Sequence, residues 1–338
     1  MNAFCRQRRT SEITASALLC AAMCLPGAAS AVEGGSGVYA LGYIASKAGL
    51  SPEPGTYLSY NMYAYSGQST TSVTLPIPLP NTSDAAQWNG KLRTDVDATV
   101  HLFSASRIFE EKLLGANIGF TVLVPHLKAT LDLSGNGALT LPGSPAVPYA
   151  LPGSGNYRHS SIGDIPVAGF LAWHDDDWHY VSLLNVYVPT GSYDKNRIVN
   201  LGKNHWAIEP IAAVTHLNRK TGLELSTAAG ITFNQKNTAT DYKSGTEFHI
   251  DGAAIQHFSA HFFVGLTGYA YQQLTADSGS GAASAYKGRV FAAGPIIGGA
   301  IPLGDKHTLY LNARYYKEFA VQNRFKGSNL YLSAAIKY

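Results

Sequence analysis

The chain has 338 residues, of which 46% are hydrophobic, 11% aromatic and only 14% charged. An average soluble domain carries about 25% charged residues, so this composition disfavours an ordinary soluble domain. The 34 glycines and 20 tyrosines, against 3 methionines, indicate strands and turns rather than helices. No apolar run reaches the roughly 18 residues that a transmembrane helix needs, so a membrane-spanning form of this chain would be a β-barrel.

Residues 1–31 have the features of a secretory signal peptide. Arg6, Arg8 and Arg9 form a basic start, a short apolar stretch follows, and Ala29-Ser30-Ala31 is a small-residue cleavage site. All three cysteines lie in this segment, so the mature chain has no thiol for a disulfide, a metal site or a nucleophile. Its removal lowers the formal net charge from +3 to +1, so the basic pI does not indicate nucleic-acid binding.

The mature chain is predicted to begin with an irregular segment and to continue as a transmembrane barrel over residues 57–338. Residues 32–56, rich in Gly, Ser and Ala, are expected to lie in or under the barrel as a lumen plug, because a wide barrel is hard to fill with side chains. About twelve antiparallel strands follow, each near the ten residues that span a membrane at barrel tilt. Their expected ranges are 57–65, 92–103, 116–127, 162–173, 178–188, 206–217, 223–234, 246–256, 261–271, 289–301, 308–319 and 329–338.

Long and short connections alternate along the chain. Residues 66–91 and 128–161 are predicted as long loops, since their prolines cannot donate to a central strand ladder. With a first strand that starts in the periplasm, every short turn falls on the periplasmic side, every long loop lies outside, and both termini are periplasmic. A soluble sandwich, the alternative for alternating strands, has no reason to keep this order.

The last ten residues favour a closed barrel. Leu330, Leu332, Ala334 and Ile336 share one face of the predicted strand, and the other face is mostly polar. As an open edge such a strand would recruit other chains, whereas pairing with the first strand removes the edge. A strand that ends on an aromatic residue, here Tyr338, also resembles the closing strand of bacterial outer-membrane barrels, which implies recognition by the barrel-assembly machinery.

The strand at 92–103 has the clearest alternation, with aliphatic residues opposite charged ones. A wall between lipid and a wet lumen needs its polar face inside, so the charged face is predicted to line the lumen. Inward polar residues form a constriction that selects solutes, or else pair with one another and fill the lumen. The predicted lumen-lining or substrate-binding residues are Arg93, Asp95, Asp97, His101, Glu209, Glu224, Glu247, His249, Asp251, Tyr310, Asn312, Arg314 and Tyr316.

Other classes of function receive less support. No cofactor or metal is expected, because the acidic turn between His174 and His179 lacks the spaced ligands and the glycine of a calcium loop. A lipid hydrolase stays open, since Ser226 and His249 are on adjacent predicted strands with inward parity. A non-conducting surface barrel gains only from the apolar region at 128–161.

Several local patterns, in order from about Ser160 to the C-terminus, resemble the outer-membrane protein family associated with the meta-pathway of phenol degradation. The patterns are Gly163-Asp164-Ile165, Val188-Pro189-Thr190-Gly191-Ser192-Tyr193-Asp194, Asn200-Leu201-Gly202-Lys203-Asn204-His205-Trp206, Glu209-Pro210, Phe233-Asn234, Asn237, Tyr242-Lys243-Ser244-Gly245, Gly268-Tyr269, Gln272 to Gly279, and Ala293-Gly294-Pro295.

This resemblance implies a porin-like barrel that is distantly akin to long-chain fatty-acid channels. It also implies that small hydrophobic or aromatic solutes are admitted. From this resemblance together with the strand pattern, we predict a monomer in the outer membrane, in contact with outer-membrane lipids, that takes up such solutes passively. No enzymatic activity and no nucleic-acid partner are predicted, and the lipid hydrolase stays the alternative.

Overall fold

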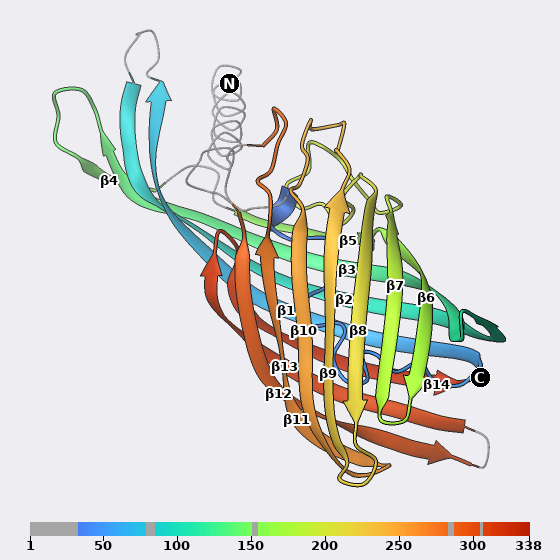
Figure 1. The fold of residues 1–338 in the computed structure, drawn as a ribbon. Coiled ribbons are helices and arrows are strands. Elements are labelled where there is room, and N and C mark those ends of the chain that lie inside the picture. Colours follow the sequence, from blue (N-terminus) through green and yellow to red (C-terminus); the bar gives the residue numbers. More distant parts are fainter. Residues whose placement is uncertain (1–32, 79–84, 151–154, 283–286, 305–306) are drawn as a thin grey trace.

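The computed structural model describes residues 33–78, 85–150, 155–282, 287–304 and 307–338, which form a closed antiparallel β-barrel of twelve strands (Figure 1). The predicted fold class and strand number are confirmed. In the described ranges, no helix is long and apolar enough to cross a membrane. The predicted signal peptide lies outside the described residues.

Twelve strands form the barrel wall, and two shorter strands pair with β3. The wall strands are β1 (Gly55–Pro78), β2 (Ala85–Leu113), β3 (Ala116–Thr140), β6 (Ile165–Asp175), β7 (Trp178–Val188), β8 (Ala207–Leu217), β9 (Leu223–Asn234), β10 (Glu247–Ser259), β11 (Phe262–Gln273), β12 (Arg289–Leu303), β13 (His307–Gln322) and β14 (Lys326–Lys337). The short strands are β4 (Val147–Ala150) and β5 (Gly155–Ile162), and a 3-10 turn, η1 (Glu33–Gly35), precedes them all.

The barrel closes between its first and last strands. β1 pairs with β14 from Tyr57↔Lys337 to Gln68↔Lys326. In β14, Leu330 and Leu332 are exposed on the outer surface, whereas the Tyr331 side chain between them is fully buried inside. The predicted alternation of this strand is therefore present, and closure leaves neither β1 nor β14 with a free edge along the paired stretch.

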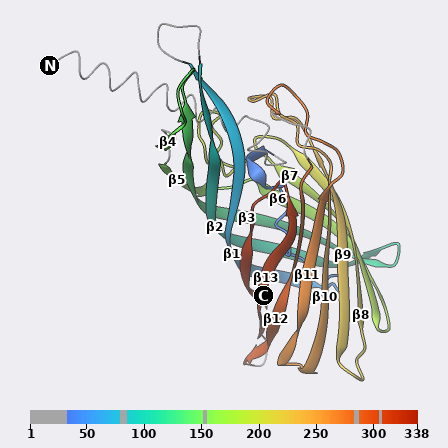
Figure 2. The ribbon, with the colours of Figure 1, turned by 90° about the vertical axis from the view of Figure 1, so that its left-hand side faces the viewer.

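The first three wall strands are far longer than predicted and project beyond the barrel (Figure 1, Figure 2). The prediction of loops at 66–91 and 128–161 is wrong, because β1 continues to Pro78, β2 begins at Ala85 and β3 runs to Thr140. The pairing of β1 with β14 stops at Gln68, so Pro76 lies where β1 bonds to β2 alone. A proline is tolerated there because that edge needs no backbone donor.

The connections between wall strands define two ends of the barrel. At the short-turn end, β2 and β3 are joined only by Leu114 and Gly115, both with positive φ, as a tight hairpin requires. Longer connections, such as residues 189–206, meet at the opposite, long-loop end. The predicted short connection at 104–115 is thus almost entirely strand.

The segment before β1 runs through the lumen from one end of the barrel to the other. The side chain of Glu33 contacts Tyr193 and Asn237 in the long loops, whereas Gly49 contacts Thr215 near the short turns. The expectation that the mature chain starts at the short-turn end does not fit Glu33, the first described residue, which lies among the long loops. β1 starts at the short-turn end, and the roughly 20 preceding residues are long enough to return through the barrel.

Candidate functional site in the barrel lumen

One half of the lumen, formed by β8 to β10, carries buried charges that compensate one another. The His249 ring lies between two carboxylates, with Nε2 3.3 Å from Glu209 Oε1 and Nδ1 3.3 Å from Asp251 Oδ2. Closer to the short turns, His257 Nε2 lies 2.7 Å from Glu224 Oε2. Burying a carboxylate is costly unless it is paired and hydrogen-bonded. His249 supplies the ion pairing, and the hydrogen bonds to Glu209 come from the Tyr187 and Thr232 hydroxyls.

The N-terminal segment supplies further donors to these carboxylates. Asp251 accepts hydrogen bonds from the Tyr39 hydroxyl at 2.5 Å and from the Gly42 amide at 3.0 Å. Glu224 accepts one from the Lys47 amide at 2.6 Å. The segment therefore sits on the charged half of the wall through charge-assisted hydrogen bonds, the stronger kind.

β13 and β14, farther along the wall, hold the segment by its carbonyl groups. Arg314 Nη1 donates to the carbonyls of Gly42 and Tyr43, the Tyr316 hydroxyl donates to that of Gly42, and the Tyr331 hydroxyl to that of Leu41. Gly42 has φ +82°, and an added Cβ would lie 3.0 Å from the Tyr316 ring. Only glycine fits this turn without strain.

At the long-loop end, Lys203 fixes the start of the segment. Its Nζ donates to the carbonyls of Glu33 and Ser36 at 2.9 and 2.7 Å. Burial lowers the pKa of the Lys203 ammonium, and the neighbouring carboxylates of Glu33, Glu247 and Asp164 oppose this effect. The Glu33 carboxylate also accepts from Asn237 Nδ2 at 3.0 Å, so both ends of η1 are held.

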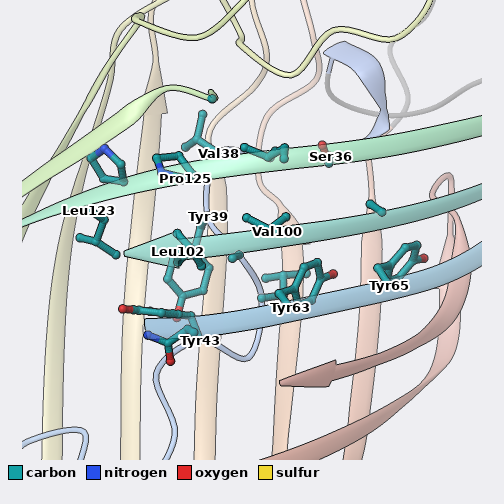
Figure 3. Close-up of a pocket in the computed structure, with 18 of the residues that line it drawn as sticks. Ser36, Val38, Tyr39, Tyr43, Tyr63, Tyr65, Val100, Leu102, Leu123 and Pro125 are labelled. Carbon is teal, nitrogen blue, oxygen red and sulfur yellow. The ribbon is translucent and has the colours of Figure 1, made fainter. Parts of the chain in front are cut away.

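The opposite half of the lumen is mostly apolar and leaves a cavity of about 760 Å³ beside the N-terminal segment. Figure 3 shows Val100 and Leu102 of β2 and Leu123 and Pro125 of β3 on one side, with Tyr39 and Tyr43 of the segment facing them. The wall residues of β2 and β3 with apolar side chains at the cavity are Val96, Ala98, Val100, Leu102, Leu123, Pro125, Leu127, Ala129 and Leu131.

The apolar wall continues beyond the barrel along the extended strands. Val73, Trp88 and Leu92 form a packed cluster with Leu133 and Ile77, all on the same faces of β1, β2 and β3 as the cavity-lining residues. Trp88 is fully buried, and its Nε1 donates to the Tyr149 carbonyl of β4. A continuous apolar surface therefore leads from the extension into the lumen.

Nine of the predicted site residues point into the lumen. Their side chains belong to the charged half, to the hydrogen bonds around the N-terminal segment, or to the cavity edge. These residues are Glu209, Glu224, Glu247, His249, Asp251, Tyr310, Asn312, Arg314 and Tyr316. Tyr316 is fully buried against the segment, whereas Tyr310 is 45% exposed at the cavity margin.

The remaining four predicted site residues do not line the lumen, and this correction concerns β2. Arg93 and Asp95 form an ion pair at 2.7 Å with side chains 54% and 36% exposed, and Asp97 is exposed as well. His101 bonds the Tyr60 hydroxyl on the same face as the exposed Phe103. Arg93 lies in the extension, whereas Asp95, Asp97 and His101 are opposite Gln68, Ser66 and Met62 of the stretch of β1 that pairs with β14. Their outward direction follows from the alternation of β2, because Val96, Val100 and Leu102 of the other face line the cavity.

The residues weighed for a hydrolase are not brought together. In the β9–β10 register His249 pairs with Gly230, whereas Ser226 pairs with Ala253. Four residues of strand separate them, roughly 13 Å. The Ser226 hydroxyl bonds Glu224 and Thr215 instead. Within the described ranges, no group of three or more His, Cys, Asp or Glu residues is placed to hold a metal ion.

The sequence matches the model of one protein family over residues 66–334, described as "Putative MetA-pathway of phenol degradation". The chain belongs to this family. The resemblance found in the sequence is therefore confirmed, and the match also includes the first half of the barrel, where the motifs were few. A search of curated proteins finds no match.

Solved structures share the barrel at low identity. An outer membrane channel from Pseudomonas putida F1 is 13% identical with a TM-score of 0.59, over 85% of this family member and 97% of the channel. A FadL homologue from Pseudomonas aeruginosa is 10% identical with a TM-score of 0.47, over 85% and 90% of the two chains. At this identity the first likeness establishes the fold alone: this family member and that channel share one barrel architecture.

Sequence reasoning missed the apolar cavity wall and the contacts of the N-terminal segment in this family member. Val96, Ala98 and Val100 were assigned to the outside because alternation alone does not say which face is inside. Tyr39 and Gly42 stand in a stretch without periodicity. One signal was present in the sequence: inward carboxylates cluster on three neighbouring predicted strands. Buried carboxylates need hydrogen-bond donors, so this cluster indicates that a further part of the chain supplies donors inside the lumen.

Proposed function

We propose that the protein is a channel of the bacterial outer membrane that admits small hydrophobic or aromatic compounds by passive diffusion. The observation that carries this proposal is the apolar inner face of β2 and β3, which borders the 760 Å³ cavity. A channel for polar solutes keeps polar groups along its path, whereas this wall offers carbon surface. Binding pockets for apolar ligands are lined in the same way.

Entry of solute begins, in this proposal, on the extended strands. Apolar compounds partition onto the half-buried Ile77 and Leu92, which pack on the buried Trp88, and move along the wall towards Val96 and Val100. The free energy of transfer of apolar surface out of water, about 25 cal/mol per Å², favours this step.

Residues 32–56 act as a plug in the proposed channel. The hydrogen bonds from Tyr39, Gly42 and Lys47 to buried carboxylates hold the segment across the lumen. Passage of solute beside it uses the cavity, and release of the segment would widen the path. Cleavage of a signal peptide after Ala31, residence in the outer membrane as a monomer and assembly through the strand that ends at Tyr338 complete the proposal.

The test is uptake of radiolabelled toluene, phenol, a long-chain fatty acid and a sugar of similar size by cells with and without the protein. We expect selective loss of apolar uptake without it. Equal loss of the sugar would make it a general porin, and no effect on any solute would favour a surface or enzymatic role.

A matched pair of variants tests the path itself. Ala98 borders the cavity, and its neighbour Thr99 points to the outer surface. Ala98→Trp is expected to reduce toluene uptake strongly because the indole fills the passage, whereas Thr99→Trp is expected to leave it unchanged. Equal uptake by the two variants would contradict the proposed path.

A further inference from the structure

Arg314 is a buried cation without an anionic partner. Its side chain is 5% exposed, and it lies within 4.0 Å of no carboxylate among the described residues. Its hydrogen-bond partners are the Gly42 and Tyr43 carbonyls and, at 3.1 Å from Nη2, the Ser333 hydroxyl, and its guanidinium lies over the Tyr331 ring, 4.6 Å from the centroid. All of these partners are neutral. Its Nε has no hydrogen-bond partner, and Asp251, on the far side of Gly42, is separated from it by that residue.

Buried guanidinium groups are normally paired, because desolvation of the charge is repaid only by an anion in good geometry. The planar fork of arginine matches a carboxylate better than any single carbonyl. Arg314 also borders the cavity, where Asn312, two residues away on the same face, has a buried Oδ1 without a partner. The wall is therefore incompletely satisfied at Arg314 and Asn312, which border the cavity. Arg324, elsewhere in the cavity lining, also has a buried Nη1 without a hydrogen-bond partner.

The strand register places Arg314 at one end of a row of paired residues that crosses neighbouring strands and ends on an apolar side chain. Arg314 pairs with Tyr331, Tyr331 with Tyr63, and Tyr63 with Val100. At about 4.8 Å per strand, Val100 lies roughly 14 Å from Arg314, with the Tyr63 ring between them. The next inward row repeats the change from polar to apolar through Asn312, Ser333, Asn61 and Leu102.

We propose that the cavity binds monocarboxylates with a compact apolar or aromatic body. The carboxylate lies against Arg314 and Ser333, and the body packs against Tyr63, Val100 and Leu102. The Lys47 ammonium, 6.0 Å from the Tyr310 ring centre at the same margin of the cavity, adds positive charge there. Glu318 also borders the cavity, but its carboxylate already accepts from Tyr65, Tyr269 and the Gly327 amide.

This inference rests on the proposed function and names a substrate class for it. The test is isothermal titration of the purified full barrel in detergent with benzoate, with benzyl alcohol, which has the same ring without the charge, and with acetate, which has the charge without the ring. Benzoate is expected to bind about tenfold more tightly than either, a difference typical of one charge-assisted pair. Arg314→Gln is expected to lose the preference for benzoate and to keep the affinity for benzyl alcohol.

Two control variants distinguish the positive charge of Arg314 from its hydrogen bonds to the N-terminal segment. Tyr316→Phe removes one hydrogen bond to the Gly42 carbonyl and leaves Arg314 in place, so it should keep the benzoate preference. Arg93→Gln removes an exposed arginine and should change nothing. Benzoate binding no tighter than benzyl alcohol or acetate, or an unchanged preference in Arg314→Gln, would overturn the inference. Such a result would leave the channel proposal standing, because that proposal is tested separately by toluene uptake. Equal loss of toluene and sugar uptake in cells without the protein would instead overturn the channel proposal itself.

Discussion

The ring of Tyr39 stacks on the ring of His249 with centroids 3.7 Å apart and planes inclined by 15°. This contact joins the N-terminal segment to the centre of the charged half-lumen, where His249 also holds Glu209 and Asp251. The segment is thus part of the interior that balances the buried charge. The position of the segment and the stability of that interior are therefore coupled.

Asp251→Ala is expected to loosen the segment and raise conductance in planar bilayers several-fold. The substitution removes the acceptor for both Tyr39 and the Gly42 amide. Each hydrogen bond to a charged group contributes about 1.5–3 kcal/mol, and 1.4 kcal/mol is a tenfold change in an equilibrium. Asp97→Ala, which removes an exposed carboxylate on the outer face of β2, is the control and should conduct like the wild type.

Deletion of residues 33–52 is expected to leave the barrel closed and to raise conductance more than Asp251→Ala does. The β1–β14 pairing starts at Tyr57 and does not include the deleted residues. Sugar uptake should appear as well, because the polar half-lumen becomes open to water. Conductance equal to that of the wild type would show that the segment does not limit the path.

Gly49→Ala is expected to displace the segment near the short-turn end. An added Cβ would lie 2.4 Å from the His179 carbonyl oxygen and 2.6 Å from the Thr215 amide, both backbone atoms of the wall. Overpacking of this kind costs about 1–3 kcal/mol. Faster hydrogen exchange of the amides at residues 46–50 would report it. In Gly169→Ala the new methyl group meets nothing within 4 Å, so exchange there should stay at the wild-type rate.

Asp241 is expected to keep two long loops together at pH 4. Hydrogen bonds from Lys236 and from Ser280 lower the pKa of this carboxyl below its ordinary value of 3.8, so the contact is fully present above that value and is lost only as the pH falls through the lower, folded pKa. The Ser280 amide, 2.9 Å from Asp241 Oδ2, should stay protected from exchange at pH 4. In Asp241→Asn protection should fall at both pH 7 and pH 4. Wild-type exchange at pH 4 as fast as in the variant would contradict the expectation.

The sequence by itself determined the barrel. Residues alternate strictly along strands such as the one that contains Leu330 and Tyr331, and short and long connections follow one another. In a membrane this pattern indicates a closed barrel, because every backbone group must be hydrogen-bonded and no strand edge can stay open. The inward parity of Glu209, His249 and Arg314 followed from the same rule, since their strands pass through the membrane with their apolar faces outside.

Only the tertiary structure decided which face of β2 is inside and where the N-terminal segment lies. A period of two divides the residues of a strand between two faces but does not say which face points into the lumen. The rule that the polar face points inward applies only where lipid covers the outside. In β2, Arg93 and Asp95 lie outside while Val96 and Val100 line the cavity, and this holds also where β2 is opposite the stretch of β1 that pairs with β14. The path of residues 33–54 depends on donors and acceptors contributed by strands far apart in sequence, and no local pattern records such contacts.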